Sequence, residues 1–255
     1  MIDSRLCGCL GGAAALLLAG CATDGIRGPD ANTRMRVAAA AEAGGQQDIA
    51  LSMYGAAAAG APNDATAQMR FAGALARAGN RAQAEQVLAA AVERNPNNRD
   101  LLIQLGRMRL RSGAAGQALN LFDRALSSDS RSVPALDGRG VALDLMGRHP
   151  EAQESYRRAQ ALDPNSVAVA NNLGLSLLLD GRPEEARAVL EPLARRSDAS
   201  QRVTANYAIS LAATGDEAGA RSILGDPDMD VAALADAFRA SNRQVIEVTP
   251  NEPRS

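Results

Sequence analysis

The chain has 255 residues, a formal net charge of −2, and aromatic residues make up only 2% of it. No lysine occurs, so the basic side chains other than one histidine are all arginines. A chain this close to neutrality, without a basic stripe in its sequence, argues against general nucleic-acid binding, which needs clustered positive charge to neutralise phosphates.

The cysteines and the single histidine exclude several kinds of active site. Cys7, Cys9 and Cys21 all lie near the N-terminus, so the body of the chain has no thiolate nucleophile and no cysteine metal site. His149 has no second histidine to join it in a metal or catalytic group. It precedes Pro150, which predicts a solvated residue in a turn between helices. With no phosphate-binding loop either, the sequence predicts a protein that is not an enzyme and has no cofactor and no metal.

Residues 1–20 have the pattern of an export signal. Arg5 precedes the apolar run 10–19, which is shorter than the roughly 20 residues that a membrane span needs. The run ends Leu18-Ala19-Gly20-Cys21, which resembles the lipobox of bacterial lipoproteins. That resemblance implies cleavage before Cys21 and acylation of its thiol and new N-terminus, which together give stable membrane anchoring. The alternatives are an ordinary signal with a chance cysteine and an uncleaved anchor.

The residues after the lipobox suggest a location and a tether. Enterobacterial lipoproteins that stay in the inner membrane carry an aspartate directly after the lipidated cysteine, whereas this chain has Ala22. The resemblance therefore implies a lipid anchor on the periplasmic face of the outer membrane. Residues 21–30 comprise the cysteine and a segment with two glycines and a proline, which predicts a flexible tether.

Residues 31–225 repeat every thirty-four residues. One register is marked by glycines at 45, 79, 113, 147, 181 and 215, and another by alanines at 50, 84, 118, 152, 186 and 220. A fixed period of this length indicates an array of helical repeats. The units are 31–64, 65–98, 99–132, 133–166, 167–200 and 201–225. Each reads as two helices, with the glycine closing the first because a C-terminal cap favours positive φ.

The repeat resembles the tetratricopeptide repeat. Its eighth position is small, as at Gly140, its twentieth is alanine, as at Ala152, and its twenty-fourth is large, as at Tyr156. The tryptophan of the fourth position is missing. The resemblance implies an all-α superhelix, or α-solenoid, of about six helical hairpins, in which small residues let the helices of a hairpin approach closely. Residues 226–240 predict a capping helix with Asp230 as its N-cap, and residues 241–255 predict a mobile tail.

In the resembling family the first helix of each unit lines a concave groove that binds a protein partner. The groove positions in the last three units are occupied by Val141, Leu145, Asn171, Asn172, Leu175, Leu178, Arg202, Asn206 and Ile209. Asn172 and Asn206 share the sixth position, where an amide could hydrogen-bond the backbone of an extended peptide or be satisfied locally. Earlier first helices carry arginines that could hold acidic partner residues or form a solvated charged face: Arg34, Arg36, Arg70, Arg107 and Arg111.

The lipobox, the repeats and the ending of residues 206–224 together resemble the TadD-type lipoproteins of tight-adherence (Flp) pilus assembly. Asn206, Gly215, Asp216 and Leu224 follow the order of that family's last unit. The resemblance implies a pilotin-like role, in which the protein binds an outer-membrane secretin or another subunit of the pilus machine. One alternative is an envelope adaptor that regulates cell-wall synthases or hydrolases, and another is a helical glycan hydrolase.

Overall fold

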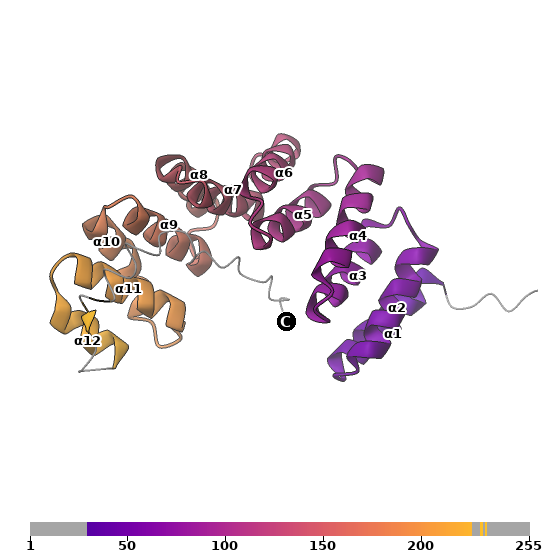
Figure 1. The fold of residues 1–255 in the computed structure, drawn as a ribbon, viewed down its shortest axis with the longest axis horizontal. Coiled ribbons are helices and arrows are strands. Elements are labelled where there is room, and N and C mark those ends of the chain that lie inside the picture. Colours follow the sequence, from indigo (N-terminus) through magenta and orange to yellow (C-terminus); the bar gives the residue numbers. More distant parts are fainter. Residues whose placement is uncertain (1–29, 226–229, 232, 234–255) are drawn as a thin grey trace, which may run out of the picture.

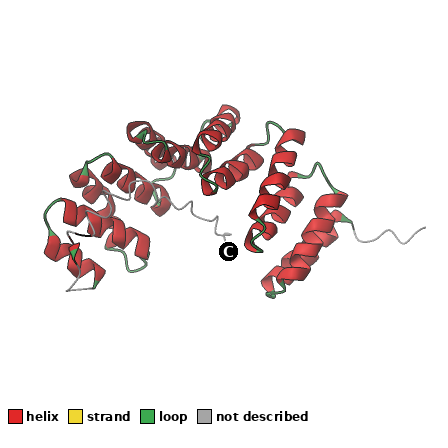
Figure 2. Cartoon of the chain, in the orientation of Figure 1, coloured by secondary structure: helices red, strands yellow, loops and turns green. Residues whose placement is uncertain are grey.

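The computed structural model describes residues 30–225 and residues 230, 231 and 233, and within them every regular element is a helix (Figures 1 and 2). The helices are α1 (Ala31–Ala43), α2 (Gln47–Gly60), α3 (Ala65–Arg77), α4 (Arg81–Arg94), α5 (Arg99–Arg111), α6 (Ala115–Ser128), α7 (Val133–Leu145), α8 (His149–Leu162), α9 (Val167–Leu179), α10 (Pro183–Ala194), α11 (Gln201–Ala213) and α12 (Glu217–Leu224). None of these helices is long and apolar enough to cross a membrane. The prediction of an all-α superhelix is confirmed.

The odd-numbered helices start at a constant interval along the chain. Their first residues are Ala31, Ala65, Arg99, Val133, Val167 and Gln201, which are thirty-four residues apart throughout. The predicted export signal, Cys21 and the tail at 241–255 lie outside the described residues, as does most of the predicted capping helix. At the start of that helix, Asp230 Oδ1 accepts a hydrogen bond from Ala233 N at 2.9 Å, and Val231 is completely buried.

Each first helix ends two residues before the glycine that marks the repeat. All six of these glycines have positive φ, between 72° and 86°. At Gly147, whose φ is 73°, the backbone N–H bonds to Asp144 O, and the following N–H of Arg148 bonds back to Leu143 O. Glycine adopts this conformation without the steric cost that a side chain would add, so it ends the helix and turns the chain into the next one.

The two helices of a hairpin touch through the small residue at the eighth position. A Cβ atom on Gly140 would lie 2.4 Å from Cε1 of Tyr156, and one on Gly106 would lie 2.8 Å from Cζ of Phe122. Gly174 has the same relation to Leu190. The expected packing of a bulky side chain against a small one is confirmed, because any side chain here would occupy the space that the bulky residue fills.

The hairpins form a curved array (Figure 1). Through its middle, α5, α7 and α9 lie on the inner edge of the arc, and α6, α8 and α10 on the outer edge. Most buried side chains belong to one continuous cluster that begins at Ala72 and ends at Val231. A second, smaller cluster joins the first hairpin to α3 and contains Ala38, Ala41, Ala50, Tyr54 and Ala74.

Candidate partner-binding face

The nine residues predicted to face a partner all lie on α7, α9 and α11. Leu145, Asn172 and Arg202 are partly exposed. The other six are at most 8% exposed: Val141, Asn171, Leu175, Leu178, Asn206 and Ile209. Contact of these residues with a partner stays a prediction, and in this conformation the six buried ones contribute little accessible surface.

The amides at the sixth position bond to the preceding unit. Asn172 Nδ2 donates to Asp137 Oδ1 at 2.8 Å, and Asn206 Nδ2 donates to Asn171 Oδ1 at 3.0 Å. Both bonds join the sixth position of one unit to the fifth position of the unit before it. Units four to six thus carry a polar ladder that ties successive first helices together.

The polar ladder also interacts electrostatically with the third unit, through Asp137 and Arg107. Burial raises the pKa of Asp137, while the bond from Asn172 and the positive charge of Arg107 oppose that rise. Burial lowers the pKa of Arg107, and the charge of Asp137 opposes this shift. Asp137 therefore links the amide ladder of the last units to an arginine on α5.

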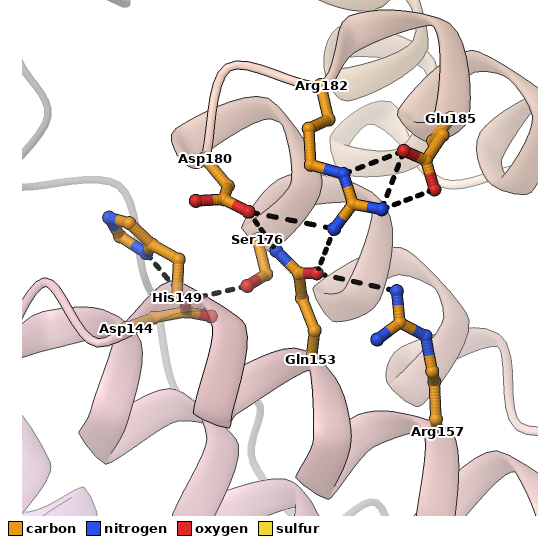
Figure 3. Close-up of polar contacts among 8 residues, drawn as sticks. All are labelled: Asp144, His149, Gln153, Arg157, Ser176, Asp180, Arg182 and Glu185. Carbon is orange, nitrogen blue, oxygen red and sulfur yellow. Dashed lines mark hydrogen bonds and ion pairs between the residues drawn. The ribbon is translucent and has the colours of Figure 1, made fainter.

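A second polar group, centred on Asp144 of α7, joins units four and five (Figure 3). The carboxylate is buried and accepts three hydrogen bonds, from His149 Nδ1 at 2.8 Å, Ser176 Oγ at 2.7 Å and Tyr156 OH at 3.0 Å. Desolvation raises the pKa of Asp144, and these three bonds oppose the rise. Desolvation also raises the pKa of Tyr156 well above 10.0, with the charge of Asp144 acting in the same direction.

His149 is not the solvated turn residue that its neighbour Pro150 suggested. It is the first residue of α8, and its side chain is only 14% exposed. The hydrogen bond to Asp144 raises its pKa above the ordinary value of 6.5, and partial burial opposes that shift. The proline sets the helix start, as it often does at a first helical turn, while the imidazole turns back to the carboxylate five residues earlier.

Gln153 extends this group to the next hairpin (Figure 3). Its side chain is 1% exposed; Nε2 donates to Asp180 Oδ2 at 2.9 Å, and Oε1 accepts from Arg182 at 2.8 Å. Arg182 also forms a two-bond ion pair with Glu185. The joint between units four and five is therefore held by a connected set of polar side chains as well as by apolar packing.

The arrangement suits a structural joint better than a reaction centre. Ser176 Oγ and Tyr156 OH both donate to Asp144, so neither hydroxyl is hydrogen-bonded to the imidazole of His149 as an activated nucleophile would be. Within the described part of the chain, no three His, Cys, Asp or Glu side chains come together as a metal site.

Two family models described as tetratricopeptide repeat match the chain, one at residues 43–106 and the other at residues 103–167 and 138–201. No curated protein sequence matches it. Similar solved structures include PilW, described as a widely conserved type IV pilus biogenesis factor, at 17% identity and a TM-score of 0.70, covering 84% of this chain and 96% of that one. PilF of Pseudomonas aeruginosa is 16% identical with a TM-score of 0.66, covering 82% of this chain and 96% of that one.

A tetratricopeptide repeat protein from Parabacteroides merdae has 16% identity and a TM-score of 0.65, covering 82% of this chain and 84% of that one. Identities this low show a shared fold. The family matches run without a break from residue 43 to residue 201 and coincide with the repeated hairpins. The chain therefore belongs to the tetratricopeptide-repeat family, whose members generally act as non-catalytic scaffolds for protein interactions.

Proposed function

We propose that the chain is a lipid-anchored scaffold on the periplasmic face of the outer membrane that assists assembly of a Tad/Flp-type pilus. Cys21 carries the anchor, and the inner side of the array binds the partner, an outer-membrane secretin or another pilus subunit. The observation that supports this most is the likeness of the whole array to PilW, of which 96% is covered, because PilW is described as a pilus biogenesis factor. The lipobox and the TadD-like last unit support the finer assignment.

The inner side of α7, α9 and α11 is the proposed contact region. Leu145, Asn172 and Arg202 are partly exposed there, whereas Val141, Leu175 and Ile209 are buried. Such a surface offers a partner segment apolar contact and a few polar groups that fix its register, which is the usual composition of a specific recognition surface.

Deletion of the gene tests the pilus role. We expect the deletion strain to lose surface pili, counted by electron microscopy, and to lose secretin multimers, measured by immunoblotting of unheated envelopes. Reintroduction of the unaltered gene should restore both. Normal pili and normal multimers in the deletion strain would refute the proposal.

The anchor and the partner are tested separately. Cys21→Ser should move the protein from the membrane fraction to the soluble periplasmic fraction, and unchanged fractionation would contradict lipidation at this residue. Affinity capture from detergent-solubilised envelopes should recover a secretin or pilus subunit. Recovery of cell-wall synthases or hydrolases instead would favour the envelope-adaptor alternative.

A further inference from the structure

The first helix of the array leaves uncovered a face that the later units bury. Positions three, seven and ten of each first helix are four and three residues apart, so they share one face of that helix. In α1 these positions hold Thr33, Val37 and Ala40, and all three side chains are exposed, Val37 by 46%. The first hairpin forms one end of the arc, so no hairpin of the described chain precedes α1 (Figure 1).

The equivalent residues of the later units show what normally packs on this face. Position three is buried in all five later units, at Ala67, Leu101, Ala135, Val169 and Val203. Position ten is buried in the same units, at Ala74, Met108, Ala142, Ser176 and Ser210. Each of these first helices packs against the second helix of the preceding hairpin. The uncovered face of α1 is therefore a continuation of the interface that joins successive units.

This face is apolar, although the outer face of a terminal repeat is usually polar. Thr33 and Ala40 are small, so another helix can approach α1 closely, and Val37 lies between them. Three large apolar residues of the described chain are exposed, and two of them, Val37 and Ile49, belong to the first hairpin. Arg36 lies at the edge of the face, where its guanidinium can stay in water. This end of the array is thus suited to a contact between helices.

The opposite end of the array is closed by residues that follow α12. Val231 is completely buried there and belongs to the main apolar cluster. A head-to-tail contact between copies, which would repeat into a filament, therefore meets no equivalent open face. The matching surface is the same face on a second copy. A two-fold axis at Val37 pairs the two helices antiparallel and brings Thr33 of one copy near Ala40 of the other.

We propose that the chain forms a two-fold symmetric dimer through the exposed face of α1, made of Thr33, Val37 and Ala40. The small residues let the two helices interdigitate, and burial of both valines supplies apolar contact. Such a contact uses the same surface on both chains and closes after two copies. Because Cys21 lies close before α1 in the sequence, both proposed lipid anchors of the dimer can reach one membrane. The dimer goes beyond the proposed pilus role and does not depend on it.

Sedimentation velocity over a series of concentrations tests the dimer on the mature chain, residues 21–255. Cys21→Ser is present throughout, so that lipid does not cause association. Val37→Glu places a carboxylate from each copy at the contact, and we expect the dimer dissociation constant to rise at least about thirtyfold because like charges then face each other. Met146→Glu is the matched control, since Met146 is 44% exposed and lies in unit four. It should change the constant less than about twofold.

Cross-linking locates the contact. The mature parent with Cys21→Ser has no cysteine, so Val37→Cys introduces a single thiol. Under mild oxidation it should form a disulfide with its own copy, because residues beside a two-fold axis approach each other. Met146→Cys should stay monomeric under the same conditions. In cells that produce the lipidated chain, a photoreactive amino acid in place of Val37 should give an adduct that contains two copies, identified by mass spectrometry.

Several results would overturn the dimer. One is a parent that stays monomeric up to about 100 μM, where even weak specific dimers form, and another is a dimer that both glutamate substitutions weaken equally. Disulfide formation through Met146→Cys and not through Val37→Cys would place the contact elsewhere. A photoadduct with another protein, with lipid or within one chain would identify a different occupant of the face.

The gene-deletion test separates the dimer from the proposed function. If the chain is monomeric while deletion still removes pili, only the dimer fails. If the dimer forms as expected while deletion leaves piliation intact, only the pilus role fails.

Discussion

The first and fourth units make the same contact in different surroundings. Tyr54 OH donates to Glu42 at 2.8 Å, and Tyr156 OH donates to Asp144 at 3.0 Å; in both units the tyrosine is at position twenty-four and the carboxylate at position twelve. Each carboxylate also reaches the next unit, Glu42 through Arg77 and Asp144 through Ser176.

The two contacts differ in how far their carboxylates are exposed to solvent. The side chain of Glu42 is 34% exposed, whereas that of Asp144 is 2% exposed. The first hairpin also belongs to the smaller apolar cluster, and the fourth unit lies inside the large one. The same repeat register can thus give a weak surface tie at one end and a buried joint in the middle, because water screens the first and is excluded from the second.

Removing each carboxylate in turn should give the largest difference in the free energy of unfolding between the two units. Asp144→Ala leaves the buried donors of Ser176 and Tyr156 without their acceptor, so we expect a loss of about 3 kcal/mol in the free energy of unfolding. Glu42→Ala should cost about 1 kcal/mol or less, because its groups are hydrated after the change. Urea unfolding followed by circular dichroism measures both, and equal losses would show that burial does not separate the two contacts.

Two glycine-to-alanine substitutions test whether the helices pack more closely in the fourth unit than at α3. Gly140→Ala places a Cβ 2.4 Å from the buried ring of Tyr156, so we expect a loss of about 1–3 kcal/mol. Gly73→Ala, on α3, meets only the flexible end of Arg77 at 3.4 Å and should stabilise by up to about 1 kcal/mol through helix propensity. Thermal unfolding of the two variants should show opposite shifts, and a stabilised Gly140→Ala variant would contradict the close approach.

Substitutions at the sixth position of the repeat should give a smaller difference in the free energy of unfolding. Asn206→Ala removes a buried bond to Asn171 and should destabilise the protein by about 1–2 kcal/mol. Arg70→Gln, at the same position of unit two, changes an exposed side chain with no bonded partner and should stay within about 0.5 kcal/mol of the parent. Urea unfolding decides this as well, and a large loss for Arg70→Gln would mean that this side chain has a structural role.

The smallest effect concerns pH. Because the pKa of His149 in the folded protein is raised above 6.5, its contribution to stability is complete below pH 6.5 and is lost as the pH rises through the folded-state pKa. The raised pKa of Asp144 likewise makes the free energy of unfolding decrease as the pH rises through it. His149 is the only histidine, so its imidazole proton resonance can be followed directly by NMR.

The pH prediction has a built-in control. Asp144→Asn removes the charge that stabilises the imidazolium, so the pKa of His149 should fall towards or below 6.5. A titration that is the same in the parent and the variant would show that the hydrogen bond between these residues does not form in solution.

The sequence was most informative where a residue's role is local. Gly147 could be assigned as a helix stop because positive φ is a property of its own backbone. Gly140 and Tyr156 could be matched because their spacing within one hairpin is fixed. The prediction for His149 is wrong because Pro150 gives only a local turn signal, whereas the partner of the imidazole is a carboxylate whose burial depends on the neighbouring unit.

The candidate face shows the same limit. Its nine residues could be placed on first helices from their register, yet the pairing of Asn206 with Asn171 spans 35 residues and crosses a unit boundary. The register of a residue within the repeat does not show whether its side chain is bonded to a neighbouring unit. The spacing of 35, one more than the repeat, is a signal that could have suggested the ladder at Asn172 and Asp137.

The repeat, the two helices of each unit and the glycine that follows the first helix could all be predicted from the amino-acid sequence alone. These follow from backbone preferences and from apolar spacing within about thirty-four residues. The packing of successive hairpins, in contrast, buries Asp144 with three donors and leaves Glu42 partly hydrated. The physical reason is that solvent exclusion and pairing between units depend on how successive hairpins rotate and stack, and each unit's environment is set by its neighbours.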